Sequence, residues 1–149
     1  MFALARQALC CAALLALSAP ALLAQEAAKP SVTVISACAA AANSYAEQTE
    51  VFSDAIKLLM YESRNNPAEQ AQRLDKLKPR QEDFKQNALS QEQEKRQSLQ
   101  LSDPEREMDS QVKTWVIDHV LDFATEKFGQ DKLFFKFYIV NRCKKQFAP

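Results

Sequence analysis

The sequence predicts an all-α protein, a small antiparallel bundle of about four helices with one disulfide linking the first and last helices. Gly129 is the only glycine among 149 residues and there are six prolines, so tight β-hairpin turns have almost no suitable residues. Alanine, glutamine, glutamate, lysine and leucine dominate the chain, and these residues favour helices. Apolar side chains recur at spacings of three and four, which is typical of one face of a helix.

The first helix is expected over residues 36–63. Apolar or small side chains recur there at alternating steps of four and three, which predicts one narrow apolar seam. Alanines crowd the first half, where their small side chains would let a partner helix approach closely. Asn65, Asn66 and Pro67 then end the helix and open the next segment. The seam consists of Cys38, Ala42, Tyr45, Thr49, Phe52, Ile56 and Leu59.

The second segment, residues 67–101, has only a thin apolar stripe. Pro79 predicts either two short helices or one helix with a kink near Lys78, because proline lacks an N–H and clashes with the preceding turn. Residues 90–100 have almost nothing to bury, so we expect a solvated helix or a mobile stretch, with a partner-binding surface as the alternative. The stripe consists of Leu74, Leu77, Phe84, Ala88, Leu89 and Leu99.

The third helix is expected to start at Pro104. Ser102 or Asp103 can cap it, proline suits the first helical position, and acidic residues follow in the first turn. Its apolar stripe is wide, which predicts a central place in the bundle. Gly129 is well placed to end the helix in a left-handed conformation. The stripe consists of Met108, Val112, Val116, Ile117, Val120, Leu121, Ala124 and Phe128.

The last segment, residues 133–147, is rich in aromatic and β-branched side chains and is a strand on propensity alone. A lone strand would have no partner in this chain, whereas Phe135, Ile139, Cys143 and Phe147 fall on one helical face, so we predict a helix. Most aromatic residues here are expected in the core. Any that are exposed on the outer face would indicate a protein or membrane partner.

The first 24 residues predict a signal peptide that is cleaved. Arg6 supplies an early positive charge, and an apolar run follows it. Cleavage after Ala24 and cleavage after Ala21 both fit the small-residue rule. The alternative of an uncleaved anchor is weaker, because the run falls short of the roughly 20 apolar residues that span a bilayer.

Removal of residues 1–24 would leave residues 25–35 as a flexible mature N-terminus and residues 36–149 as a single helical domain, with no membrane span. Cys38 and Cys143 remain, and an even pair in an exported chain predicts one disulfide. Closing a loop of about a hundred residues contributes roughly 4 to 5 kcal/mol in the chain-entropy model. We therefore expect a periplasmic or secreted protein.

Composition excludes several classes of function. The chain has 19 basic and 19 acidic residues, so it lacks the basic footprint of nucleic-acid-binding proteins. A single glycine excludes a glycine-rich phosphate loop. His119 is the only histidine, and with two cysteines oxidised it does not make a zinc site. Met60 or Met108 with His119 would be the only haem ligands, without a C-x-x-C-H motif. We predict no catalytic residue, metal or cofactor.

The candidate interaction surface lies on the third helix and consists of Trp115, His119, Asp122 and Glu126. Carboxylates near an imidazole make a surface that responds to pH, although a histidine at the boundary of the core is the simpler interpretation. The expected function is non-catalytic binding of an unidentified envelope protein, as an inhibitor, immunity protein or adaptor. The alternatives are a periplasmic stress chaperone that exposes apolar surface and, third, a small redox or haem carrier. The sequence sets no oligomeric state.

Overall fold

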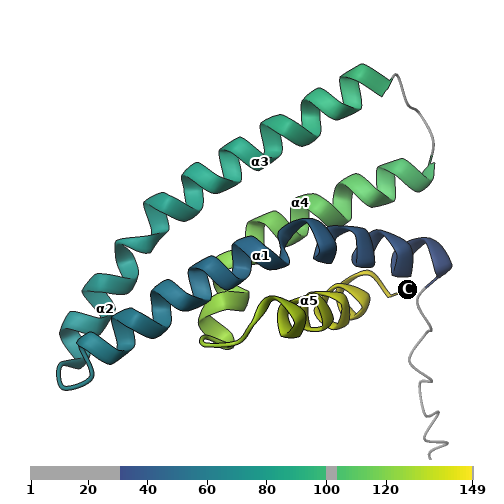
Figure 1. The fold of residues 1–149 in the computed structure, drawn as a ribbon. Coiled ribbons are helices and arrows are strands. Elements are labelled where there is room, and N and C mark those ends of the chain that lie inside the picture. Colours follow the sequence, from purple (N-terminus) through teal and green to yellow (C-terminus); the bar gives the residue numbers. More distant parts are fainter. Residues whose placement is uncertain (1–30, 100–103, 149) are drawn as a thin grey trace, which may run out of the picture.

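The structure is a computed structural model that describes residues 31–99 and 104–148. These residues form five helices (Figure 1). The predicted all-α class is confirmed, and so is the disulfide between the first and last helices. The predicted signal peptide lies outside the described residues, as do the proposed caps Ser102 and Asp103. The helices are α1 Val32–Glu62, α2 Pro67–Asp75, α3 Leu77–Leu99, α4 Pro104–Glu126 and α5 Lys132–Phe147.

Side-chain caps set where the helices begin. The Ser31 side chain accepts a hydrogen bond of 3.2 Å from the backbone N–H of Val34, so α1 begins at Val32, four residues before the predicted start. Residues 32–35, expected in a flexible N-terminal segment, are thus the first turn of α1. Asn66 caps α2 with Pro67 at the first helical position, as predicted. Asp131 caps α5 in the same way.

The second predicted segment is divided into a short helix and a long one. The break lies at Lys76, two residues before the predicted kink, where the backbone N–H bonds to the Arg73 carbonyl oxygen at 3.1 Å. Pro79 falls in the first turn of α3, where its missing N–H leaves no helical hydrogen bond unmade. We refer to α2 and α3 together as the arm.

Helices α1 and α4 run parallel through the middle of the molecule, with α3 on one side and α5 on the other, both antiparallel to them (Figure 1). The start of α4 lies beside the start of α1, because Arg106 and Asp109 share a hollow with Ser36. At the other end, the backbone N–H of Gly129 donates to the Ser53 hydroxyl at 2.7 Å. Gly129 has a left-handed φ of 79°, as predicted, but α4 ends at Glu126, so Gly129 lies three residues after the helix rather than directly after it.

The core is shared by α1, α4 and α5. The predicted seam of α1 is buried from Cys38 to Ile56, and it is wider than expected because Ala37, Ala41 and Ala46 are buried too. Phe128, predicted on the α4 stripe, is instead 44 % exposed in the turn after the helix, and Phe123 fills the core. The fully buried side chains of α4 and α5 are Val112, Val116, Ile117, Val120, Phe123, Ala124, Phe135, Ile139 and Cys143.

Helix α5 is a helix as predicted, and its buried face joins α1 through the disulfide. Cys38 and Cys143 are both fully buried, with Cα atoms 5.7 Å apart and a sequence separation of 105 residues. The small alanines of α1 allow this close approach. Within residues 31–99 and 104–148, no helix is long and apolar enough to cross a membrane.

The arm contacts the rest of the molecule mainly through side chains. Helix α3 packs along α4. Helices α3 and α1 are farther apart, and in the described chain only long side chains such as Tyr45 and Phe84 bridge them. The Phe84 ring meets Tyr45 and Phe52 edge-on, with ring centres 6.2 and 6.3 Å apart. Among the residues of the arm's predicted stripe whose burial the structure describes, only Leu77 and Ala88 are buried. The thin stripe therefore makes a correspondingly thin interface.

Candidate interaction surfaces

The predicted interaction surface on α4 divides into a packed half and an exposed half. The Trp115 ring lies over His119 with ring centres 4.7 Å apart, and both rings are half-buried. A ring nitrogen of His119, Nδ1, lies 2.8 Å from the Trp115 carbonyl oxygen. Phe123 and Phe147 extend this stack, at 5.6 and 5.8 Å from Trp115. These aromatic side chains join α4 to α5, which is a structural role.

The two carboxylates of the predicted surface are exposed. Glu126 accepts a hydrogen bond from the Tyr138 hydroxyl and lies 3.4 Å from the guanidinium of Arg142, so it links α4 to α5. Burial, then the hydrogen bond to Glu126 and its charge, raise the pKa of Tyr138 to about 12. Asp122 forms no ion pair with any described residue and borders a hollow beside Leu74 and Lys78 of the arm. The structure therefore packs Trp115 and His119 partly into the core and leaves Asp122 and Glu126 exposed.

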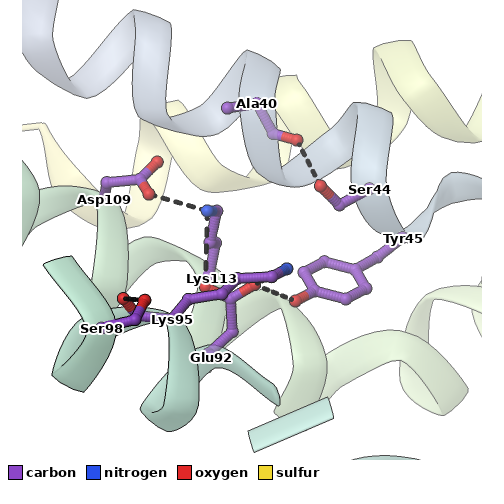
Figure 2. Close-up of polar contacts among 8 residues, drawn as sticks. All are labelled: Ala40, Ser44, Tyr45, Glu92, Lys95, Ser98, Asp109 and Lys113. Carbon is purple, nitrogen blue, oxygen red and sulfur yellow. Dashed lines mark hydrogen bonds and ion pairs between the residues drawn. The ribbon is translucent and has the colours of Figure 1, made fainter.

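A polar network lies between α1, α3 and α4, and it includes Glu92 of the 90–100 stretch, for which the sequence predicts a solvated helix or a mobile stretch (Figure 2). The Tyr45 hydroxyl donates to Glu92 at 3.2 Å, and Glu92 lies 3.4 Å from the ammonium groups of both Lys95 and Lys113. Lys113 also pairs with Asp109 at 2.8 Å. The side chains of Glu92 and Lys113 are only 14 % and 18 % exposed. The network therefore attaches the end of the arm to the core.

The network shifts two pKa values upward. Burial raises the pKa of Tyr45, and the charge and hydrogen bond of Glu92 raise it further. Burial lowers the pKa of Lys113, but the hydrogen bond to Asp109 and the charges of Asp109 and Glu92 outweigh burial, so the net shift is upward. A lysine and a tyrosine that hold their protons this firmly are poor bases at neutral pH. This geometry favours a structural network over a catalytic one.

Two of the hollows that adjoin the arm differ in chemistry. The one beside the polar network, about 230 Å³, is lined mainly by charged side chains of α3 and α4, among them Arg96, Arg106 and Glu107. Arg96 and Glu107 form an ion pair of 2.6 Å across it. Its charges are therefore largely satisfied by one another.

The other hollow lies where α1 meets α2 and α3, and we call it the corner hollow. It has a volume of about 430 Å³ and combines apolar side chains with a basic rim. Leu58 is 58 % exposed at its edge. Lys76 and Arg80 form no ion pair within the described residues, whereas Arg73 is bound by Glu62 and Glu69. The lining consists of Ala55, Leu58, Leu59, Glu62, Arg73, Lys76, Leu77 and Arg80.

Sequence reasoning missed the corner hollow because its residues come from three helices. A weak signal was present: Leu58 and Val51 lie off the predicted seam of α1, and both are exposed. Helical periodicity assigns such residues to an outer face and says nothing of which element lies beside them.

Metal-ligating side chains are scattered over the described chain. Across residues 31–99 and 104–148, no three histidine, cysteine, aspartate or glutamate side chains are grouped closely enough to hold a metal ion. His119 is committed to the aromatic stack, and Cys38 and Cys143 are joined to each other. No protein-family model, curated protein or solved structure matches this chain.

Proposed function

We propose that this protein is a non-catalytic binding protein of the cell envelope, and that it holds a segment of a partner protein in the corner hollow. The observation that carries the proposal is the pairing of an exposed apolar edge at Leu58 with two cations, Lys76 and Arg80, that have no ion-pair partner in the described chain. Exposed apolar surface rimmed by polar groups is typical of interaction sites.

The chemistry of the hollow specifies its occupant. Apolar side chains of α1 and α3 would bury one or two apolar side chains of the partner, and the basic rim would pair with carboxylates beside them. A short amphipathic segment that carries aspartate or glutamate next to leucine or phenylalanine fits both features. An acidic segment is favoured over a basic one because Glu62, the acidic residue of the lining, is already paired with Arg73.

The envelope location rests on two further features. Cys38 and Cys143 form a buried disulfide, a bond that persists in oxidising compartments. The apolar N-terminal run with small residues at Ala21 and Ala24 supports export. In this proposal the partner is therefore another protein of the periplasm or the exterior. An inhibitor, an immunity protein and an adaptor would all bind such a partner through the same apolar and basic side chains.

The test is selection from a random peptide library against the folded, oxidised protein, followed by affinity measurement. We expect the selected peptides to combine acidic and apolar residues, and to bind Lys76→Glu/Arg80→Glu at least about tenfold more weakly, which is 1.4 kcal/mol. The double variant Lys144→Glu/Lys145→Glu on α5 changes net charge equally and should bind as the wild type does. Selected peptides that are basic, or that bind both variants alike, would contradict the proposal.

A stress chaperone is the second candidate, and the attachment of the arm favours it. Ion pairs of α3 with α4, such as Lys85–Asp118 at 2.8 Å and Arg96–Glu107 at 2.6 Å, lie beside a thin apolar interface. Protonation of these carboxylates in acid would remove the pairs and expose Phe52 and Phe84. Dye binding to exposed apolar surface should then rise on acidification. A constant dye signal, with the arm attached throughout, would exclude this candidate.

A further inference from the structure

The outward side of α5 carries apolar side chains that nothing in the described chain covers. Leu133 is 62 % exposed and Phe137 is 65 % exposed, one helical turn apart. Phe128, in the turn just before α5, is 44 % exposed. The opposite side of α5 is occupied by the buried residues Phe135, Ile139 and Cys143, so these exposed side chains are not a loose part of the core.

The same helix concentrates positive charge. Residues 131–148 contain five basic residues and one acidic residue, Asp131, in a chain with 19 of each sign. Two of the five are paired, Lys132 with Glu47 and Arg142 with Glu126. The other three, Lys136, Lys144 and Lys145, have no ion-pair partner among the described residues.

Helical geometry places these groups on one surface. Leu133, Phe137, Val140 and Lys144 recur at steps of four, three and four, which is one stripe along a helix. Lys136 and Lys145 are nine residues apart and lie on opposite flanks of that stripe, and Val140 within the stripe is partly buried against the core. We call this set of six residues the α5 outer surface. Helix α5 lies on the other side of α1 and α4 from α3 (Figure 1), and the buried disulfide at Cys143 anchors it.

We propose that the α5 outer surface binds an anionic lipid surface, with α5 lying flat in the interface. Leu133 and Phe137 would enter the boundary between headgroups and acyl chains, while the three unpaired lysines would lie against lipid phosphates. The shape of the surface favours lipid over an acidic protein. A single helix forms a convex ridge that a planar membrane accepts directly, and none of the hollows described above is lined by α5 residues.

This inference is independent of the corner hollow. The corner hollow is lined by residues of α1, α2 and α3, and none of the six residues of the α5 outer surface belongs to that lining. The two surfaces can therefore be inactivated separately. Membrane attachment through α5 would leave the corner hollow open to a partner.

The test is co-sedimentation with vesicles, using protein purified from the periplasm of an expressing bacterium, whose mass establishes which N-terminus it carries. Phosphatidylcholine vesicles are compared with vesicles that also contain phosphatidylglycerol. We expect binding to the anionic vesicles alone, weakening as salt is raised. Lys144→Gln/Lys145→Gln should reduce the partition coefficient about 25-fold, since each interfacial lysine contributes about fivefold.

Two further variants sharpen the test. Leu133→Gln/Phe137→Gln, at exposed positions, should lower partition at least about tenfold while leaving the circular dichroism spectrum and thermal unfolding unchanged. Lys76→Gln/Arg80→Gln removes the same charge from the corner hollow and should bind vesicles as the wild type does. Equal binding to both kinds of vesicle, equal loss in both charge variants, or absence of binding to anionic vesicles would each overturn the inference. Selection of acidic peptides by the α5 outer surface without vesicle binding would replace lipid by an acidic protein partner.

Discussion

The two sides of the central α1–α4 pair are built differently. On one side, α5 buries Phe135 and Ile139 completely and is joined to α1 by the disulfide at Cys143. On the other side, α3 contributes a half-buried Phe84 and a set of ion pairs, and it meets α1 through side chains alone in the described chain. The comparison teaches that stability is distributed unevenly in this small bundle, with a firmly held core and a weakly held arm.

Composition explains the contrast. The buried face of α5 is aromatic and aliphatic, whereas α3 presents few large apolar side chains to its neighbours. Burial of apolar area is the main favourable term in folding, so α5 gains far more from docking than α3 does. Ion pairs such as Lys85–Asp118 are about one third exposed and contribute little by themselves.

The largest expected effect is on the α5 side. Phe135→Ala removes a fully buried aromatic side chain, and such changes cost about 3 to 5 kcal/mol. Urea unfolding followed by circular dichroism measures the loss as a lower midpoint. Phe137→Ala, at a 65 % exposed position two residues later on the same helix, is the matched control and should change the midpoint little. Similar losses in the two variants would contradict the burial of Phe135.

Removal of the disulfide should have the next largest effect. Cys38→Ala with Cys143→Ala opens a link across 105 residues, and loss of a native disulfide typically costs about 2 to 4 kcal/mol. The fold should remain helical, because the core around the cysteines is apolar. If reduction of the wild type and the double substitution both left the urea midpoint unchanged, the disulfide would have no role in holding α5.

On the arm side, Phe84→Ala should cost less, about 1 to 2 kcal/mol, because the ring is only half-buried. The loss should be local. Hydrogen exchange is expected to accelerate in α3 while the amides of α4 and α5 keep their protection. Exchange that accelerates uniformly over all helices would show that the arm and the core unfold as one unit.

The smallest effect concerns pH and the Tyr45–Glu92 hydrogen bond. The pKa values of Tyr45 and Lys113 are raised, so both groups hold protons more firmly in the folded state than in the unfolded chain. The ordinary pKa values of tyrosine and lysine lie at about 10. The two groups therefore stabilise the fold fully below about pH 10, and this stabilisation is lost as the pH rises through their pKa values in the folded state. Tyr45→Phe should cost about 1 kcal/mol at neutral pH.

The measurement is urea unfolding of both proteins at a series of pH values. Above about pH 10 the wild type should lose stability relative to Tyr45→Phe, because ionisation of Tyr45 then favours the unfolded chain. Tyr138 is present in both proteins and serves as an internal control. Parallel stability curves over the whole range would contradict the raised pKa of Tyr45.

Much of the fold follows from local sequence. Caps at Asn66 and Asp131 and the left-handed Gly129 act over one helical turn, so residue type alone indicates helix ends. The predicted start of α1 is four residues late, because the Ser31 cap precedes the apolar seam from which the prediction begins. The pairing of Cys38 with Cys143 followed from counting cysteines. The choice of helix over strand for α5 followed from periodicity, against its β propensity.

The interaction surfaces were not predictable in the same way. Trp115 and His119 belong to the predicted interaction surface on α4, but both are half-buried, because Phe147 of α5 packs against Trp115 and His119 stacks between Trp115 and Phe123. Glu92 was assigned to a solvated stretch, but Tyr45 and Lys113 approach it from two other helices. In both places a side chain that is distant in sequence determines how far the predicted surface residue is buried.

By itself, then, the sequence determined the all-α class, the helix faces and the disulfide, because spacing and caps act between neighbouring residues. Only the tertiary structure decided that α1 and α4 form the central parallel pair, that α3 is held as an arm, and that Leu58, Lys76 and Arg80 meet in the corner hollow. Periodicity identifies which side of a helix is buried. It carries no information on which other helix covers that side, since packing joins residues that are far apart in sequence.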